Sequence, residues 1–224
     1  MEDKEIYAEI SSIRNLMERS TKFISLSGLS GILAGVYALA GAAFAQYAIN
    51  NDSDTFNKYI QDQIQANKGQ ALFIGVQPER LVLFLLFIAV SVLLLSIATG
   101  IFLTIRKAKR KGLSVWNQSS RSFLISGAIP LLTGGCFVLI ELYNSHYSII
   151  APGCLVFYGL ALVAAGQYTF GDVKWLGICQ IILGLFAALV PGYGLLLWAT
   201  GFGLLHIIYG TLMHFKYDRD HVAQ

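Results

Sequence analysis

Six long runs of apolar residues constrain this chain more than any other feature. The hydrocarbon core of a bilayer is about 30 Å thick, and an α-helix of about 20 apolar residues crosses it. The runs that reach or approach this length are Phe23–Ala48, Leu81–Ile105, Ser122–Tyr143, Ile149–Phe170, Trp175–Val190 and Tyr193–Phe215. Because these runs are continuously apolar and do not alternate, they predict helices and not barrel strands. The expected fold is all-α: a polytopic membrane protein whose single domain, residues 23–215, has six transmembrane helices.

The composition excludes two other classes of protein. Of the 224 residues, 55% are hydrophobic and only 13% are charged, whereas soluble domains carry about 25% charged residues. A water-soluble enzyme is therefore disfavoured. The formal net charge of +3 is too small to indicate binding to nucleic acid. The expected surroundings are a lipid bilayer.

The distribution of lysine and arginine predicts the orientation. The segment 106–121 between the second and third runs carries six cations and no acid, namely Arg106, Lys107, Lys109, Arg110, Lys111 and Arg121. With the amino-terminal arm, the loop at Lys174 and the tail, one side of the membrane has thirteen cations, and the other side has three. Cytoplasmic loops carry such an excess. We expect both termini to be cytoplasmic. The basic segment also fits a lipid-headgroup site, but topogenic charge is the favoured explanation.

The amino-terminal arm, residues 1–22, shows helical periodicity. Its apolar residues Ile6, Ile10, Ile13 and Met17 form one stripe, which predicts an amphipathic cytoplasmic helix over Glu2–Ser20. This helix would lie on the membrane surface, pack on the basic loop or pair between protomers. A tail over residues 216–224 is expected on the same side.

The segment 49–80 is the largest predicted external loop. Asp52, Ser53 and Asp54 precede apolar residues at helical spacing, so we expect a new helix capped by these residues. The stretch Ala71–Val76 is apolar and is expected to rest at the membrane rim. The loop would be an amphipathic connector or a lid over the bundle.

Glycine pairs recur along the spans. Five of the six predicted spans carry two glycines seven residues apart, namely Gly28 and Gly35, Gly127 and Gly134, Gly159 and Gly166, Gly177 and Gly184, and Gly203 and Gly210. Seven residues are nearly two helical turns, so each pair marks one helix face. Helix faces without side chains let neighbouring backbones approach closely, which is how helices associate in lipid. The pattern predicts helix packing through these ten glycines, in three tandem helical hairpins.

The residues 175–215 resemble a known family. The segments Trp175-Leu176-Gly177-Ile178, Leu183-Gly184-Leu185 and Ala188-Leu189-Val190-Pro191-Gly192, followed by Gly203 and Gly210, look like the repeated unit of HdeD-like bacterial membrane proteins. The resemblance is weaker over residues 122–170 and poor over the first hairpin. It implies a six-span protein of three hairpins in a bacterial inner membrane, with a role in envelope stress or regulation. The long external loop, the amphipathic arm and the single glycine Gly100 in the second span depart from that pattern.

Polar residues inside the spans are the candidates for a site, because burying them in lipid is costly. Glu141 lies near the outer end of the third span, and His206 lies deeper in the sixth. The other candidates for binding a ligand or relaying protons are Gln180, Gln167, Tyr158 and Tyr209. A neutral His206 bonded between helices and a Glu141 that reaches the headgroups are the alternatives. A further ion pair is expected between Asp172 and Lys174 in a tight loop.

Signatures of catalysis are hard to find. The three cysteines, Cys136, Cys154 and Cys179, lie inside spans without metal-binding spacing, and the histidines lack a ligand motif, so no metal site is expected. No nucleophile elbow or phosphate-binding loop occurs. The sequence therefore favours a non-enzymatic membrane protein that binds itself or another membrane protein. The alternatives are a membrane enzyme acting on lipid and a small channel or transporter, in which Pro130 and the following glycines would break the third span.

Overall fold

The computed structural model of the chain describes residues 27–66, 79–110, 112, 114–144, 146–190 and 192–218. These ranges are helical apart from short connections, and they contain no strand. Six helical stretches are long and apolar enough to cross a membrane, namely Gly28–Asn51, Leu81–Arg110, Gln118–Tyr143, Tyr147–Tyr168, Asp172–Leu189 and Gly194–Tyr217. The predicted all-α fold with six membrane-spanning helices is confirmed. The predicted arm helix over Glu2–Ser20 and almost all of the tail lie outside the described residues.

The first three spans are uninterrupted α-helices: α2 (Gly28–Ala66), α3 (Glu79–Arg110) and α4 (Gln118–Tyr143). The fourth span joins the 3₁₀ turn η1 (Tyr147–Ile149), helix α5 (Ile150–Ala165) and the 3₁₀ turn η2 (Gly166–Tyr168). The fifth is α6 (Asp172–Leu189). The sixth span, Gly194–Tyr217, alternates α7 (Gly194–Trp198), the π-helix η3 (Ala199–Leu205), α8 (His206–Met213) and the π-helix η4 (His214–Asp218).

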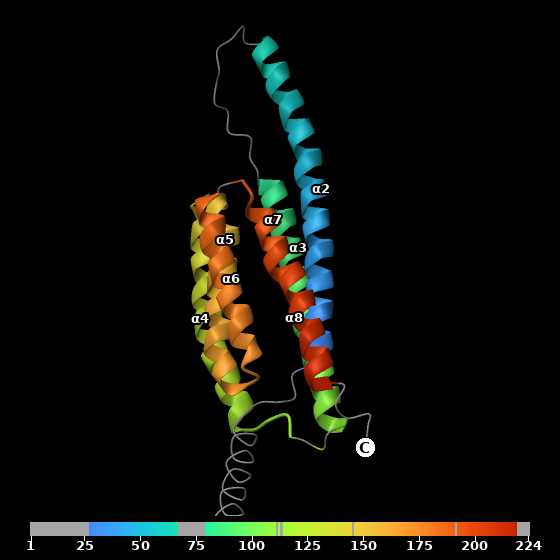
Figure 1. Cartoon of the computed structure of the whole chain (residues 1–224). Coiled ribbons are helices and arrows are strands. Elements are labelled where there is room, and N and C mark those ends of the chain that lie inside the picture. The colour runs from blue at the N-terminus through green and yellow to red at the C-terminus, as the bar shows by residue number, and fades with distance from the viewer. Residues whose placement is uncertain are drawn as a thin grey trace, which may run out of the picture.

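The expected break after residue 48 is wrong. Helix α2 continues without interruption through Asp52, Ser53 and Asp54 to Ala66, so these residues cap no new helix (Figure 1). Acidic and small polar residues only weakly favour the start of a new helix when the preceding turn is already helical. The carbonyl groups of that turn are in place to accept the next backbone hydrogen bonds of the same helix. The apolar stretch Ala71–Val76 lies outside the described residues.

Helix α4 shows how local residues set a boundary. At its start, the Asn117 side chain accepts a hydrogen bond from the Ser120 backbone N–H at 2.8 Å, and the Ser120 hydroxyl accepts one from the Asn117 N–H at 2.9 Å. This reciprocal pair satisfies two backbone donors that the helix leaves open. Pro130 lies inside the helix, which continues to Tyr143. The break at Pro130 that the channel or transporter alternative would use is therefore absent from this helix.

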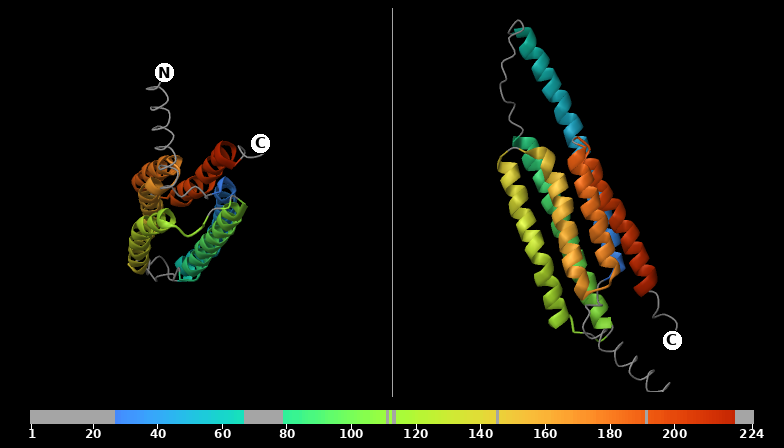
Figure 2. Two further views of the ribbon diagram at one scale, coloured as in Figure 1. Left: turned by 90° about the horizontal axis from the view of Figure 1, so that it is seen from below. Right: turned by 60° about the vertical axis from the view of Figure 1, so that its left-hand side comes forward.

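The six spans form two groups of three. Helix α5 packs between α4 and α6, and α2 packs between α3 and the sixth span (Figures 1 and 2). The groups meet where α7 and η3 contact α5 and α6. The start of α2, the end of α3, the start of α4 and the end of the sixth span lie at the same end of the bundle. We call this the basic end, because Lys107, Lys109 and Arg110 lie in the last turn of α3.

Two antiparallel crossings bring glycine backbones together. A Cβ atom built on Gly28 would lie 2.6 Å from the Gly210 carbonyl oxygen, and one on Gly210 would lie 2.7 Å from the Gly28 oxygen. The same reciprocity joins Gly159 and Gly177, at 2.6 and 2.7 Å. Real Cβ atoms do not approach so closely, so a larger residue would push the helices apart.

The other predicted glycines also lie at contacts between helices. Cβ atoms on Gly35, Gly166 and Gly184 would meet the sixth span, α6 and α5 respectively, and those on Gly127, Gly134 and Gly203 would meet Ala165, Phe157 and Leu39. In contrast, Gly100 and Gly135 have open space where a Cβ would lie. Glycines outside the predicted pairs, such as Gly41 and Gly201, also lie at close contacts, so the contacts are not confined to the seven-residue spacing.

The predicted arrangement of three hairpins is not confirmed. Helices α2 and α3 are neighbours, and so are α4 and α5. However, α6 packs most extensively on α5, and the sixth span packs most extensively on α2. The last two spans therefore do not form a closely packed pair along their whole length.

Candidate functional site

A buried polar cluster joins three spans around His206. This side chain is 6% exposed, and Gln180 is 0% exposed. His206 lies at the start of α8, Gln180 in the middle of α6 and Tyr158 in α5. Packing between α5, α6 and the sixth span therefore brings together groups up to 48 residues apart in the chain.

The hydrogen bonds place a proton on Nδ1 of His206. This atom lies 3.0 Å from the Gly201 carbonyl oxygen, which can only accept, so Nδ1 donates. Its Nε2 atom lies 2.8 Å from the Tyr158 hydroxyl, which donates to it when the ring is neutral. Both ring nitrogens are thus bonded within the bundle. In a protonated ring, Nε2 would instead donate to the Tyr158 oxygen.

Gln180 binds the same carbonyl group. Its Nε2 atom donates to the Gly201 oxygen at 2.8 Å, and it lies 3.5 Å from His206 Nδ1 because the two donors share one acceptor. The Gln180 Oε1 atom is buried and has no hydrogen-bond partner among the described residues. An unpaired acceptor of this kind costs about 1–3 kcal/mol.

The local backbone explains why the Gly201 carbonyl oxygen can accept hydrogen bonds from two side chains. Gly201 lies in the π-helical segment η3, and such segments displace backbone carbonyls from the regular ladder. A Cβ on Gly201 would lie 2.5 Å from Gln180 Oε1 and would also collide with Leu155. The absence of a side chain is therefore required for Gln180 to reach the carbonyl.

Aromatic rings close one side of the cluster. The Phe202 ring is stacked on the His206 ring with centroids 5.9 Å apart, and it lies 4.9 Å from the Tyr158 ring and 5.0 Å from the Trp198 ring. These contacts hold the imidazole in a fixed orientation. The arrangement links three helices and joins two groups that can exchange a proton, Tyr158 and His206.

A second polar cluster lies at the basic end of the bundle. Asp172 Oδ2 accepts from Lys216 Nζ and from the Tyr217 hydroxyl, both at 2.9 Å. The Tyr217 ring stacks on Phe170 with centroids 4.1 Å apart, and Lys107 Nζ lies 5.7 Å from the Phe170 centroid. The expected pairing of Asp172 with Lys174 is therefore wrong: folding brings Lys216 to Asp172 from 44 residues away.

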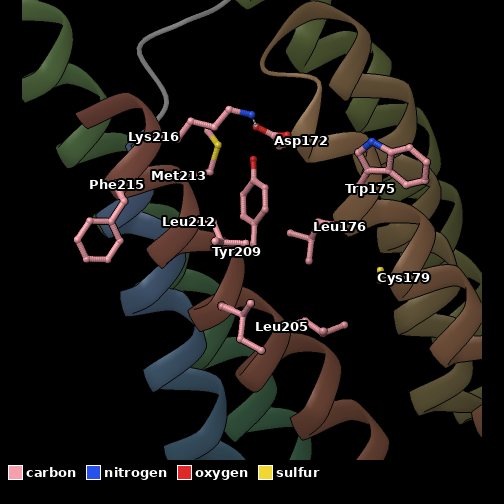
Figure 3. Close-up of a pocket in the computed structure, with 11 residues that line it drawn as sticks. Asp172, Trp175, Leu176, Cys179, Leu205, Tyr209, Leu212, Met213, Phe215 and Lys216 are labelled. Atoms are coloured by element: carbon pink, nitrogen blue, oxygen red, sulfur yellow. Dashed lines mark hydrogen bonds and ion pairs between the residues drawn. The ribbon is translucent and has the colours of Figure 1, made fainter. Parts of the chain in front are cut away.

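Between α6 and the sixth span, next to this cluster, is a pocket of about 600 Å³. Its walls are apolar side chains from both helices, and Asp172 and Lys216 lie at one end (Figure 3). Tyr209 projects toward that ion pair. The Tyr209 hydroxyl is buried without a hydrogen-bond partner among the described residues.

The predicted candidates thus separate into three places. His206, Gln180 and Tyr158 lie together, and Tyr209 lies in the pocket. Glu141 lies elsewhere, with its Oε2 atom 2.8 Å from Nδ1 of the exposed His146. Gln167 is exposed in η2 and takes part in none of the cluster's hydrogen bonds.

Sequence reasoning missed the groups that complete both clusters. The Gly201 carbonyl carries no side-chain signal, although two nearby glycines, Gly201 and Gly203, mark the place where η3 packs tightly. The partners of Asp172 lie at the carboxyl end of the last span, and no local pattern indicates them. The three cysteines are free. No group of three potential metal ligands gathers anywhere in the described ranges.

Comparisons with known proteins do not identify a family for this chain. The likeness to HdeD-like proteins over residues 175–215 therefore stays a prediction. No family model, no curated protein and no solved structure matches this chain.

Proposed function

We propose that this chain is a non-enzymatic integral membrane protein with an envelope-stress or regulatory role. The observation that carries the proposal is the hydrogen bonding of His206. Its Nε2 atom bonds Tyr158 of α5 at 2.8 Å, and its Nδ1 atom bonds the Gly201 carbonyl of its own span at 3.0 Å, which Gln180 of α6 also binds. A histidine so engaged stabilises one packing of the helices.

The surroundings of the protein are part of this proposal. We place it in a bacterial inner membrane with both termini in the cytoplasm, because basic residues gather at one end of the bundle. The glycine faces and the resemblance to three-hairpin HdeD-like proteins favour a protein that binds other helices. Its partner would be a second copy of the chain or another membrane protein.

The proposal predicts that the purified protein does not conduct ions. Proteoliposomes that contain it should hold H⁺, Na⁺ and K⁺ gradients as long as protein-free liposomes, because the side chains of His206 and Gln180 are buried among packed helices. The measurement uses pH- and potential-sensitive dyes under each gradient. Flux that disappears in His206→Ala and persists in His146→Ala would contradict the proposal.

One observation favours a second candidate, a small channel or transporter with its polar site near His206. The buried Gln180 Oε1 atom lacks a donor, and it lies beside a π-helical segment with a displaced carbonyl. Polar groups of this kind inside a membrane often belong to ion or proton pathways. The flux measurement therefore decides between the two candidates.

A further inference from the structure

The pocket between α6 and the sixth span is an apolar groove that opens sideways. Its walls are formed by Leu176 and Cys179 of α6 and by Leu205, Ile208 and Leu212 of the sixth span. Ile208 and Leu212 are among the large exposed hydrophobic residues. The groove volume of about 600 Å³ lies in the range of sites for small ligands. Because both helices are long and apolar enough to cross a membrane, acyl chains would lie against the open side of the groove.

The polar end of the groove carries one charge of each sign. Lys216 and Asp172 side chains are 58% and 38% exposed, so their ion pair is accessible and contributes little stability. Tyr217 also holds the Asp172 carboxylate, at 2.9 Å. The carboxylate therefore keeps one hydrogen bond and its position when Lys216 moves away.

Tyr209 supplies an unused polar group below this pair. Its ring lines the groove, and its hydroxyl is buried and unpartnered among the described residues. Figure 3 shows Tyr209 directed at the Asp172–Lys216 pair, which covers that end. An oxygen acceptor that enters as Lys216 swings outward would satisfy this hydroxyl.

We propose that the groove binds a zwitterionic phospholipid with a primary ammonium headgroup. One acyl chain lies along the apolar walls. Lys216 leaves Asp172 and binds the phosphate, and the lipid ammonium takes its place on the Asp172 carboxylate. Tyr209 donates to a phosphate or ester oxygen. The two opposite charges of the protein thus meet the two opposite charges of the headgroup, which is the pairing that charge-assisted hydrogen bonds favour.

This charge pattern discriminates among lipids. An anionic glycerol headgroup offers Lys216 a phosphate but leaves the Asp172 carboxylate facing negative charge. A choline headgroup has the right charges, but its quaternary ammonium has no N–H to donate to Asp172. The groove would bind its lipid whether or not the protein conducts ions, so the flux measurement and the lipid measurement are independent.

The test is native mass spectrometry on delipidated full-length protein. Phosphatidylethanolamine, phosphatidylcholine and phosphatidylglycerol with identical acyl chains are each titrated in turn. Phosphatidylethanolamine should bind about tenfold more tightly than the other two. In Asp172→Asn this advantage should disappear, and Asp172→Glu should restore most of it. Equal dissociation constants for the three lipids on the unaltered protein would overturn the proposal.

The place of binding is tested with a matched pair of variants. Ile208→Trp fills the groove and should weaken binding of phosphatidylethanolamine, whereas Leu132→Trp, at a residue of α4 that is 70% exposed and does not line the groove, should leave it unchanged. Equal binding by both variants would contradict the proposed site. A dimer that Ile208→Trp converts to a monomer would show that a second copy occupies the groove, and it would also overturn the proposal.

Discussion

Replacing Gly210 by leucine is expected to destabilise the protein severely. A Cβ at this position would lie 2.5 Å from the Ile32 backbone nitrogen and 2.7 Å from the Gly28 carbonyl oxygen. The neighbouring atoms belong to a helix backbone and cannot move aside singly, so α2 and the sixth span must separate. Overpacking of this kind costs about 3 kcal/mol, which corresponds to a fall of roughly 6–12 °C in the unfolding midpoint. The measurement is thermal unfolding in detergent, followed by tryptophan fluorescence.

Gly184→Leu is expected to act in the same way at the α5–α6 crossing, where a Cβ would lie 2.7 Å from Val156 Cγ2 and 2.9 Å from the Val156 nitrogen. The matched controls are Gly100→Leu and Gly135→Leu, because a Cβ at either position has no neighbour within 4 Å. These controls share the gain in helix propensity and lack the collision. If all four variants melt at the same temperature, glycine faces do not hold the helices together.

The second large effect is expected for His206→Ala. The substitution removes a buried ring that contacts Tyr158 and Phe202, and it leaves the Tyr158 hydroxyl without its acceptor. A cavity and an unsatisfied buried donor together cost about 3–5 kcal/mol. The free energy of unfolding, measured with denaturant in a micelle, should fall by this amount.

Two further variants separate the hydrogen bond from the packing. Tyr158→Phe removes only the hydroxyl and should cost about 1 kcal/mol. In the His206→Ala background the same substitution should instead be neutral or stabilising, because it removes the hydroxyl that His206→Ala leaves without an acceptor. His146→Ala, at an exposed side chain paired with Glu141, should cost less than about 1 kcal/mol. A loss as large for His146→Ala as for His206→Ala would argue against a special role of the buried cluster.

The spans could be predicted from the sequence because lipid imposes a length and an apolar composition on each helix separately. The same reasoning located the glycine faces, since the spacing of Gly28 and Gly35 is a property of one helix. It could not tell which helix each face meets. Gly203 and Gly210 pack on α2 and not along α6. Several helices present similar glycine faces, and the packing of all six spans together decides which two faces meet.

The candidate site was predictable only in part, for the same reason. His206 and Gln180 stand out as polar residues in apolar runs. The free-energy cost of burying a polar side chain in lipid can be judged for each residue separately, so the sequence alone identifies them. Their shared acceptor is a backbone carbonyl in a π-helical segment, which no residue type marks. Likewise, Asp172 has a cation two residues away in the sequence, but the fold supplies Lys216 and Tyr217 from the far end of the chain.

The most direct test of this account is an experimental density map of the protein in a lipid nanodisc, at a resolution that shows ordered water around His206. The account predicts an imidazole in contact with the Tyr158 hydroxyl and the Gly201 carbonyl, enclosed by packed side chains. A continuous file of water molecules passing this histidine from one end of the bundle to the other would contradict it.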